Sequence, residues 1–135
     1  MKRFIWLLVA ELLIVAVVPI IFITIHDRFS AGMVAGTIFI AIGVYIVFLG
    51  FKDLTFRRSL SFFAGLLHLF VSALPLFITR LIEYSKGFDD VQVLGLPGPA
   101  FHQLSTTIFS ILILATVTDL TRAWWRQRHH PHKLN

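Results

Sequence analysis

The sequence predicts an all-α integral membrane protein: an antiparallel four-helix transmembrane bundle with its N and C termini in the cytoplasm. Of the 135 residues, 57% are hydrophobic and only 14% are charged, and the mean hydropathy is +0.84. A soluble domain of this length leaves most of its residues in contact with water, so it cannot hide that much apolar surface. Four stretches reach the ~20 apolar residues that a membrane-spanning helix needs.

We expect a single membrane domain over residues 1–135, with four spans at about 4–25, 31–51, 60–80 and 103–120. The first span is interrupted only by Glu11 and Pro19, and the second contains no charge. The first apolar stretch is too long for the core of a signal peptide, and no small-x-small cleavage site follows it, so we expect it to be retained. The short links at 26–30 and 52–59 make consecutive helices antiparallel neighbours.

The basic residues predict the orientation in the membrane, because cytoplasmic loops carry an excess of Lys and Arg. Most of them lie on the side of the two termini: Lys2, Arg3, Lys52, Arg57, Arg58, Arg122, Arg126, Arg128 and Lys133. The other side holds Arg28, Arg80 and Lys86. This bias predicts an inner-membrane protein with both termini inside. It also accounts for the basic pI of about 10.3, so we expect the lipid bilayer, and no nucleic acid, as a partner.

The second external link, about residues 80–101, is long enough to have structure or function of its own. It contains VLGLPGPAF, residues 93–101, whose glycines and prolines interrupt a regular helix. We expect either a loop that lies on the membrane surface and caps the bundle, or a short re-entrant or partner-binding segment.

The cytoplasmic tail, residues 121–135, is basic and aromatic. Tryptophan favours the headgroup layer of a bilayer, and arginine favours anionic lipid. The tail therefore predicts a lipid-interface anchor, formed by Arg122, Trp124, Trp125, Arg126 and Arg128.

Small residues predict helix-packing seams on the second and third spans. On the second span the seam comprises Gly32, Gly36, Gly43 and Gly50, and on the third span it comprises Ser61, Gly65, His68 and Ser72. Helices in lipid associate mainly by close backbone approach at such residues. The glycine seam meets either a helix of the same bundle or another subunit, and His68 is expected to face protein and not lipid.

Four polar residues are predicted to lie in a similar slab of the membrane, one on each span: Glu11, Tyr45, His68 and Thr116. An unpaired charge at that depth costs ~3 kcal/mol on insertion scales. We expect Glu11 and His68 to form an intramembrane pair. The pair either fixes the packing of the bundle, or carries a proton or an ion or contacts a ligand. The alternative is that no pair forms and each residue meets another subunit.

A second polar cluster is predicted on the external face, from His26, Asp27, Glu83 and His102. No HxH, HxxxH or HExxH spacing accompanies it, so we expect no metal site. The chain has no cysteine, which excludes disulfides and thiol catalysis. The histidines differ in depth, which disfavours a bis-histidine haem, and we expect no cofactor.

Three functions remain open. The first is a non-enzymatic subunit or assembly partner of a larger membrane complex, bound to another membrane protein or to copies of itself. The second is a small transporter or proton-coupled channel component that uses Glu11 and His68. The third is a membrane enzyme acting on lipid, with His68 or His102 as acid or base, although no nucleophile motif accompanies them.

Overall fold

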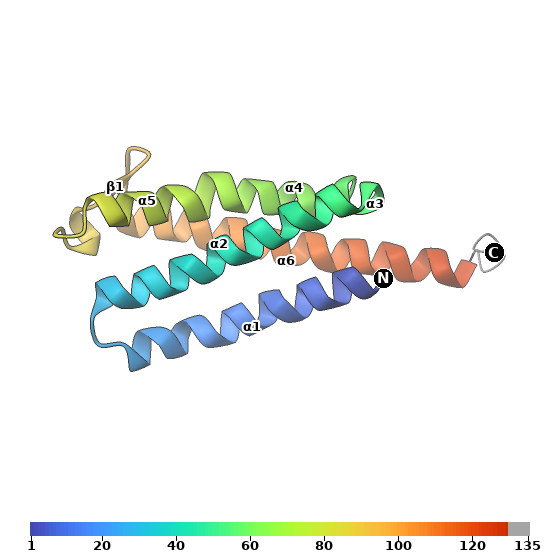
Figure 1. Cartoon of the computed structure of the whole chain (residues 1–135), viewed down its shortest axis with the longest axis horizontal. Coiled ribbons are helices and arrows are strands. Elements are labelled where there is room, and N and C mark those ends of the chain that lie inside the picture. Colours follow the sequence, from blue (N-terminus) through green and yellow to red (C-terminus); the bar gives the residue numbers. More distant parts are fainter. Residues whose placement is uncertain (130–135) are drawn as a thin grey trace.

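Four long helices run in alternating directions in the computed structural model, which describes residues 1–129 (Figure 1). They are α1 (Lys2–Thr24), α2 (Arg28–Lys52), a third helix that runs continuously through α4 (Leu60–Leu67), η1 (His68–Ala73) and α5 (Leu74–Ile82), and α6 (Gly98–His129). Each of the four is long and apolar enough to cross a membrane. This confirms the prediction of an all-helical chain with four long apolar helices.

The two ends of the bundle differ in character. The end that carries Met1, the short helix α3 (Leu54–Arg57) and the last turns of α6 is called here the basic end (Figure 1). The opposite end, called the hairpin end, carries the link between α1 and α2 and the segment between α5 and α6. That segment holds a 3-10 turn, η2 (Phe88–Asp90), and two strands, β1 (Gln92–Val93) and β2 (Leu96–Pro97).

Side-chain caps start three of the helices. Asp27 precedes α2 and accepts hydrogen bonds from the backbone N–H groups of Phe29 and Ser30. Asp53 accepts one from the N–H of Thr55 at the start of α3 and also pairs with Arg3. Ser59 accepts one from the N–H of Phe62 at the start of α4. Such caps satisfy backbone donors that lack a partner within the helix, so they fix where each helix begins.

Glycines mark the places where α2 and the third helix approach most closely. A Cβ added at Gly43 would lie 2.9 Å from the Cβ of Leu69, and one added at Gly65 would lie 2.5 Å from Cγ2 of Ile46. Similar close contacts pair Gly36 with Phe77 and Gly50 with Phe62. The glycine seam therefore packs inside this bundle and not on another subunit.

Gly32 departs from the predicted seam. A Cβ at this position would meet no atom of residues 1–129 within 4 Å. The GxxxG spacing with Gly36 is present in the sequence, and the third helix reaches this end of α2, where Arg80 lies 5.6 Å from the ring centroid of Phe29, but no described side chain covers Gly32. Gly32 is thus not a packing residue within the bundle.

The middle of the third helix widens into the π-helical segment η1, which the sequence did not predict. Pro75 lies in the first turn of α5, directly after η1. Proline lacks an N–H, and its ring clashes with the carbonyl four residues earlier, here that of Val71. A widened turn relieves such a clash, which explains why η1 ends where α5 begins.

The link between the third helix and α6 folds as a small antiparallel hairpin. Leu94 and Gly95 form its turn with φ of 51° and 81°, as in a type I′ turn. Its buried side chains, Val91 and Val93, pack with Phe101 of α6 and Leu76 of α5. The hairpin therefore covers the ends of α5 and α6.

The loop is shorter than predicted. We expected an external loop over about 80–101, but α5 continues to Ile82 and α6 begins at Gly98. Pro99 lies in the first turn of α6, where its missing N–H has no helical partner to lose. A Cβ at Gly98 would lie 2.2 Å from the carbonyl oxygen of Phe88, so the start of α6 requires glycine.

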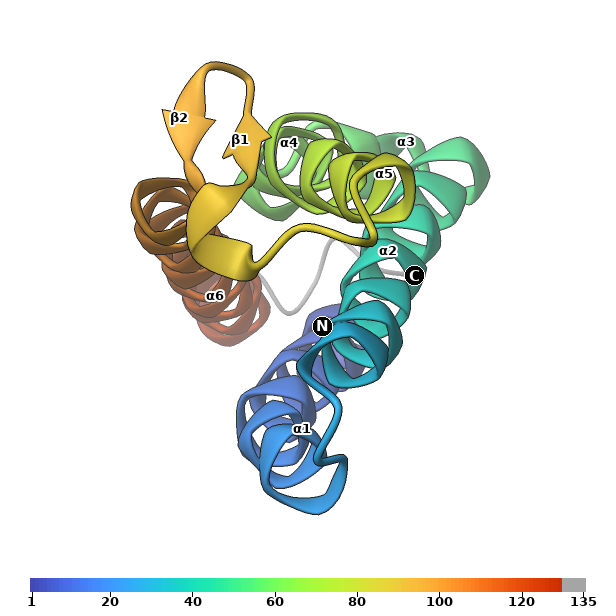
Figure 2. The same cartoon turned by 90° about the vertical axis from the view of Figure 1, so that its left-hand side faces the viewer.

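Helix α1 has all its buried residues in its first half, and in its second half Val18 packs against the core but is only partly buried. Its buried residues are Leu7, Glu11 and Ile14, and no residue from Val15 to Thr24 is buried. Both views show α1 and α6 close together near the basic end and separated at the hairpin end (Figures 1 and 2). The outer half of α1, defined as residues 15–24, therefore lies beside α2 alone.

Candidate functional site

Helix α6 makes buried polar contacts with two other long helices, and these contacts form the candidate functional site. The contact nearest the basic end joins α6 to α4. Asp119 is 6% exposed, and its Oδ2 accepts hydrogen bonds from the N–H of Ser61 at 2.8 Å and from the Ser61 hydroxyl at 2.7 Å. The carboxylate thus satisfies a backbone donor at the start of α4, where the helix dipole favours negative charge.

The second contact joins α6 to α1. Glu11 is fully buried, and its Oε1 accepts a hydrogen bond from the Thr116 hydroxyl at 2.8 Å. The other carboxyl oxygen, Oε2, has no hydrogen-bond partner among residues 1–129. A buried polar atom without a partner is uncommon in folded proteins, so Glu11 keeps an unused capacity to bind a proton or a ligand atom.

The third contact lies nearer the hairpin end and joins α6 to η1. The hydroxyl of Ser72 donates to the hydroxyl of Ser105 at 2.7 Å. Ser72 is buried and Ser105 is half-buried. Together with the Asp119 contact, this bond ties the third helix to α6 at its start and at its middle.

His68 occupies an aromatic cage between these levels. It is 2% exposed, on the side of the helix that the small-residue seam predicts. Its ring centroid lies 5.6 Å from that of Phe39 and 5.2 Å from that of Phe109. Neither ring nitrogen has a hydrogen-bond partner within the described part of the chain. The cage presents the faces and edges of two aromatic rings to the imidazole.

The predicted pair of Glu11 and His68 does not form. Glu11 lies level with Thr116, whereas His68 lies against Phe109. Seven residues of α6 separate those two levels, which corresponds to ~10 Å along the helix axis. The prediction of a common slab was wrong for this pair. It placed each residue by counting from the predicted cytoplasmic end of its span, and these ends lie at different levels in the bundle.

Tyr45 also lies outside the predicted group. Its side chain is 39% exposed, on the outside of α2. Tyr45 follows Gly43 by two residues, and two residues turn an α-helix by about 200°. Since Gly43 faces the third helix, Tyr45 points away from it. Of the four residues expected in one slab, only Glu11 and Thr116 are in contact.

The predicted external cluster is dispersed over the hairpin end. Asp27 is engaged with Ser30, whose hydroxyl and backbone N–H both donate to it. These bonds hold the pKa of Asp27 below its ordinary value of 3.8. Glu83 pairs with Lys86 at 3.1 Å. Each carboxylate therefore has its own local partner.

The two histidines of that cluster, His26 and His102, are exposed. His102 stacks edge-on against Phe88, with ring centroids 6.1 Å apart, and His26 lies in the link before α2. In residues 1–129, no group of three His, Asp or Glu side chains is placed to hold a metal ion.

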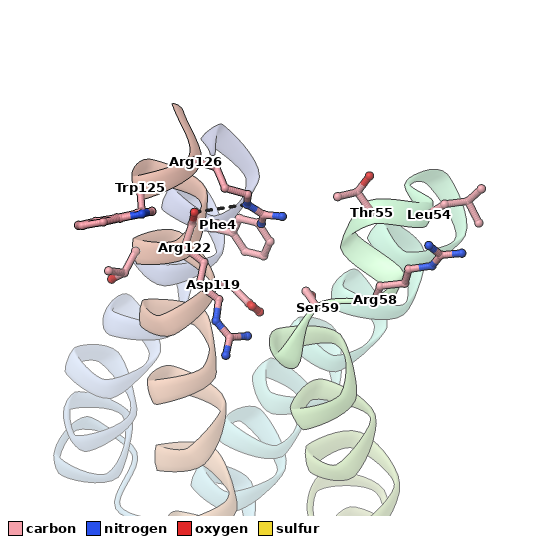
Figure 3. A pocket seen from close by; sticks show the side chains of 10 residues that line it. Phe4, Leu54, Thr55, Arg58, Ser59, Asp119, Arg122, Trp125 and Arg126 are labelled. Atoms are coloured by element: carbon pink, nitrogen blue, oxygen red, sulfur yellow. Dashed lines mark hydrogen bonds between the residues drawn. The ribbon is translucent and has the colours of Figure 1, made fainter. Parts of the chain in front are cut away.

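A pocket of about 830 Å³ opens at the basic end, between the segment around α3 and the last turns of α6. Figure 3 shows Asp119, Arg122 and Arg126 on α6 facing Ser59 across it, with Arg58 on the far rim beside Leu54. The lining also includes Phe4, Thr55, Thr121 and Trp125. The pocket thus combines cations, hydroxyls and apolar rings.

The residues of the predicted anchor belong to a helix, because α6 continues to His129. Arg128 lies 4.1 Å from the ring centroid of Trp124, and the ring of Trp125 lies 4.3 Å from that of His129. Both tryptophans are exposed. Residues 130–135 of the predicted tail lie outside the described residues.

Sequence reasoning did not predict the contacts of Asp119 and Ser105. The signal for Asp119 was a carboxylate near the end of an otherwise apolar helix, level with the polar start of the third span. Ser105 carried no signal, because it lies among other hydroxyl residues whose side chains bond to their own helix: Thr106, Thr107 and Ser110.

No protein-family model, curated protein or solved structure matches this chain.

Proposed function

We propose that this protein spans the inner cell membrane four times, with both termini in the cytoplasm, as a non-enzymatic subunit or assembly partner of a larger membrane complex. The orientation rests on charge. Of the Lys and Arg in residues 1–129, eight lie at the basic end and three, Arg28, Arg80 and Lys86, lie at the hairpin end. The basic end is therefore assigned to the cytoplasm.

The observation that carries the assembly function is the exposed outer half of α1. The rest of the bundle is joined by glycine contacts and by buried hydrogen bonds. Residues 15–24 have neither, and α1 diverges from α6 along this stretch (Figures 1 and 2). We assign this face to a transmembrane helix of a partner protein, because association in lipid depends on close packing and none of residues 15–24 is fully buried by the described part of the chain.

The natural absence of cysteine allows a direct test, since single-cysteine variants carry a unique attachment point. We expect Ile20→Cys and Ile23→Cys, labelled with a photoactivated benzophenone in native membranes, to yield adducts with another chain. Leu13→Cys is the matched control, because Leu13 and Ile20 are each 58% exposed and lie on the same helix. Leu13 lies in the half of α1 that packs on the bundle, so its adducts should be few.

The adducts are identified by mass spectrometry. An adduct with a different membrane protein supports the proposed subunit role, and an adduct of twice the chain mass replaces the partner by a second copy. Equal labelling at Leu13 and Ile20, or lipid adducts alone at both, would refute an interface on the outer half of α1.

A second candidate function is a small transporter or proton-coupled channel component. It is favoured by the unpartnered buried atoms, Oε2 of Glu11 and both ring nitrogens of His68. Ionisable residues inside a membrane often mark the path of an ion or proton. The ~10 Å between their levels requires at least one intervening carrier, such as water.

Proton flux tests this candidate. The protein is placed in liposomes that enclose a pH-sensitive dye, and an acid pulse is applied outside. If Glu11→Gln and His68→Phe each lower a protein-dependent flux at least about tenfold while Thr118→Val does not, the transport function holds. Thr118 is a suitable control because its hydroxyl bonds only to the carbonyl of Leu114 on its own helix. Wild-type flux equal to that of empty liposomes rejects it.

A further inference from the structure

The pocket at the basic end is built from two parts of the chain that are far apart in sequence. One wall comes from the segment around α3, with Thr55, Arg58 and Ser59, and the other comes from the end of α6. Its volume of about 830 Å³ lies in the range of pockets that hold small molecules. The hydrogen bonds between Asp119 and Ser61 join the two walls at its base.

In residues 1–129, no acidic side chain forms an ion pair with the guanidinium groups of this pocket. The ion pairs found in residues 1–129 are Arg3 with Asp53 and Lys86 with Glu83. Arg58, Arg122 and Arg126 are in neither, and the pocket lining contains one carboxylate, which leaves an excess of two positive charges. That carboxylate, Asp119, is buried and already accepts two hydrogen bonds.

A nearby cation extends this positive field. A second pocket of about 600 Å³ shares Phe4, Thr55 and Arg126 with the first. It adds Lys2 to the lining, together with Arg3 and Asp53, which pair with each other. Guanidinium groups bind phosphate oxygens through paired hydrogen bonds, and hydroxyl groups such as those of Thr55 and Ser59 donate further ones. The donor set therefore fits a phosphate group.

The apolar part of the lining distinguishes a lipid from a free anion. Phe4, Leu54 and Trp125 line the same pocket as the arginines, and Leu54 and Trp125 are exposed. Aromatic side chains with flanking cations are typical of the membrane interface, where an acyl chain continues from a charged headgroup. We propose that this pocket is a binding site for the phosphate of an anionic phospholipid, held by Arg58, Arg122 and Arg126.

Binding is measured with the full-length protein in detergent micelles by native mass spectrometry, with phosphatidylglycerol as the probe. We expect saturable binding of phosphatidylglycerol and at least tenfold weaker binding of zwitterionic phosphatidylcholine. In the variant with Arg58→Gln and Arg122→Gln, phosphatidylglycerol should bind about tenfold or more weakly, because charge-assisted hydrogen bonds are lost.

The matched control carries Arg57→Gln and Arg128→Gln. It removes the same charge from the same end of the bundle, at residues adjacent to or near the pocket arginines that line neither pocket. This control should lose at most about threefold in affinity, since only the general attraction to anionic lipid is weakened. Equal losses in the two double variants would overturn the site, because bulk charge would then explain the binding.

A charge-preserving variant guards against misfolding. Arg58→Lys with Arg122→Lys keeps the charge but loses the paired donors of guanidinium, so binding should fall between the wild type and the glutamine variant. Competition separates lipid from a soluble anion. If millimolar inorganic phosphate leaves phosphatidylglycerol bound, the lipid assignment holds, and if it displaces the lipid completely, the lipid assignment is overturned.

Discussion

An alanine at Gly43 should destabilise the bundle, whereas an alanine at Gly32 on the same helix should not. At Gly43 the new Cβ would lie 2.8 Å from Cδ1 and 2.9 Å from Cβ of Leu69. A rotamer change moves Cδ1 away but leaves the Cβ contact, so α2 and the third helix must separate. At Gly32 no atom of residues 1–129 lies within 4 Å of the added methyl group.

The expected magnitude follows from two opposing terms. Replacing a helical glycine by alanine lowers the entropic cost of ordering the backbone by about 0.5–1 kcal/mol, and this gain applies at both positions. Overpacking of a close contact costs about 1–3 kcal/mol, and this cost applies only at Gly43. The local gain cancels in the comparison, so Gly43→Ala should be about 1–3 kcal/mol less stable than Gly32→Ala.

The assay is reversible unfolding in mixed micelles, in which sodium dodecyl sulfate is titrated against a mild detergent and helicity is followed by circular dichroism. Gly65→Ala provides an independent second site, since its Cβ would lie 3.1 Å from the Cβ of Ile46. If Gly43→Ala and Gly65→Ala are both as stable as Gly32→Ala, the close approach of α2 and the third helix is not what holds them together.

Two further predictions concern the polar caps. Asp119→Ala should lower the free energy of unfolding by about 2–3 kcal/mol, because it leaves two buried donors without an acceptor. Ser61→Ala should lower it by only about 1 kcal/mol, because Asp119 still accepts the bond from the backbone N–H. The same detergent titration measures both variants, and equal effects would contradict the capping role of Asp119. The lowered pKa of Asp27 means that its contribution to stability is present above the unfolded-state pKa and is lost as the pH falls through the folded-state pKa. The difference in stability between wild type and Asp27→Asn should therefore be constant near neutral pH and shrink below the ordinary value of 3.8; a difference that persists at still lower pH would exclude the carboxylate as its source.

The helices were predictable from sequence because the length of an apolar run and the length of a link act locally. The glycine spacing likewise indicated a contact face, and the structure places Gly43 against Leu69. Which helix would meet that face was left open, since a repeat on one helix carries no information about its neighbour. Gly32 belongs to the same sequence pattern, but an added Cβ would meet no atom of residues 1–129, although Arg80 of the third helix reaches α2 at Phe29.

The polar site was harder to predict because it depends on how helices are shifted along one another. Ser61 lies level with Asp119 and Glu11 lies level with Thr116, and neither offset is visible in a single span. The side of the helix on which a residue lies, by contrast, could be predicted from the sequence. The 200° turn between Gly43 and Tyr45 already placed the tyrosine opposite the seam, so its exposure could have been predicted.

The π-helical segment shows where a local signal is insufficient. Pro75 follows η1, but Pro19 of α1 lies within an unbroken α-helix. Proline alone therefore does not determine a widened turn. The difference is that η1 is held from two sides, since His68 packs between Phe39 and Phe109 and Ser72 bonds to Ser105, whereas the outer half of α1 is held by α2 alone.

The distribution of polar contacts also limits where a partner helix can dock. Insertion between the third helix and α6 would have to break the Ser61–Asp119 bonds at the start of the third helix and the Ser72–Ser105 bond at its middle. Docking on the outer half of α1 breaks none of the hydrogen bonds between helices, because the contact between Glu11 and Thr116 lies in the inner half. A buried hydrogen bond left unmade costs about 1–3 kcal/mol. The open side between α1 and α6 is therefore the face on which a partner helix gains packing without losing an existing contact.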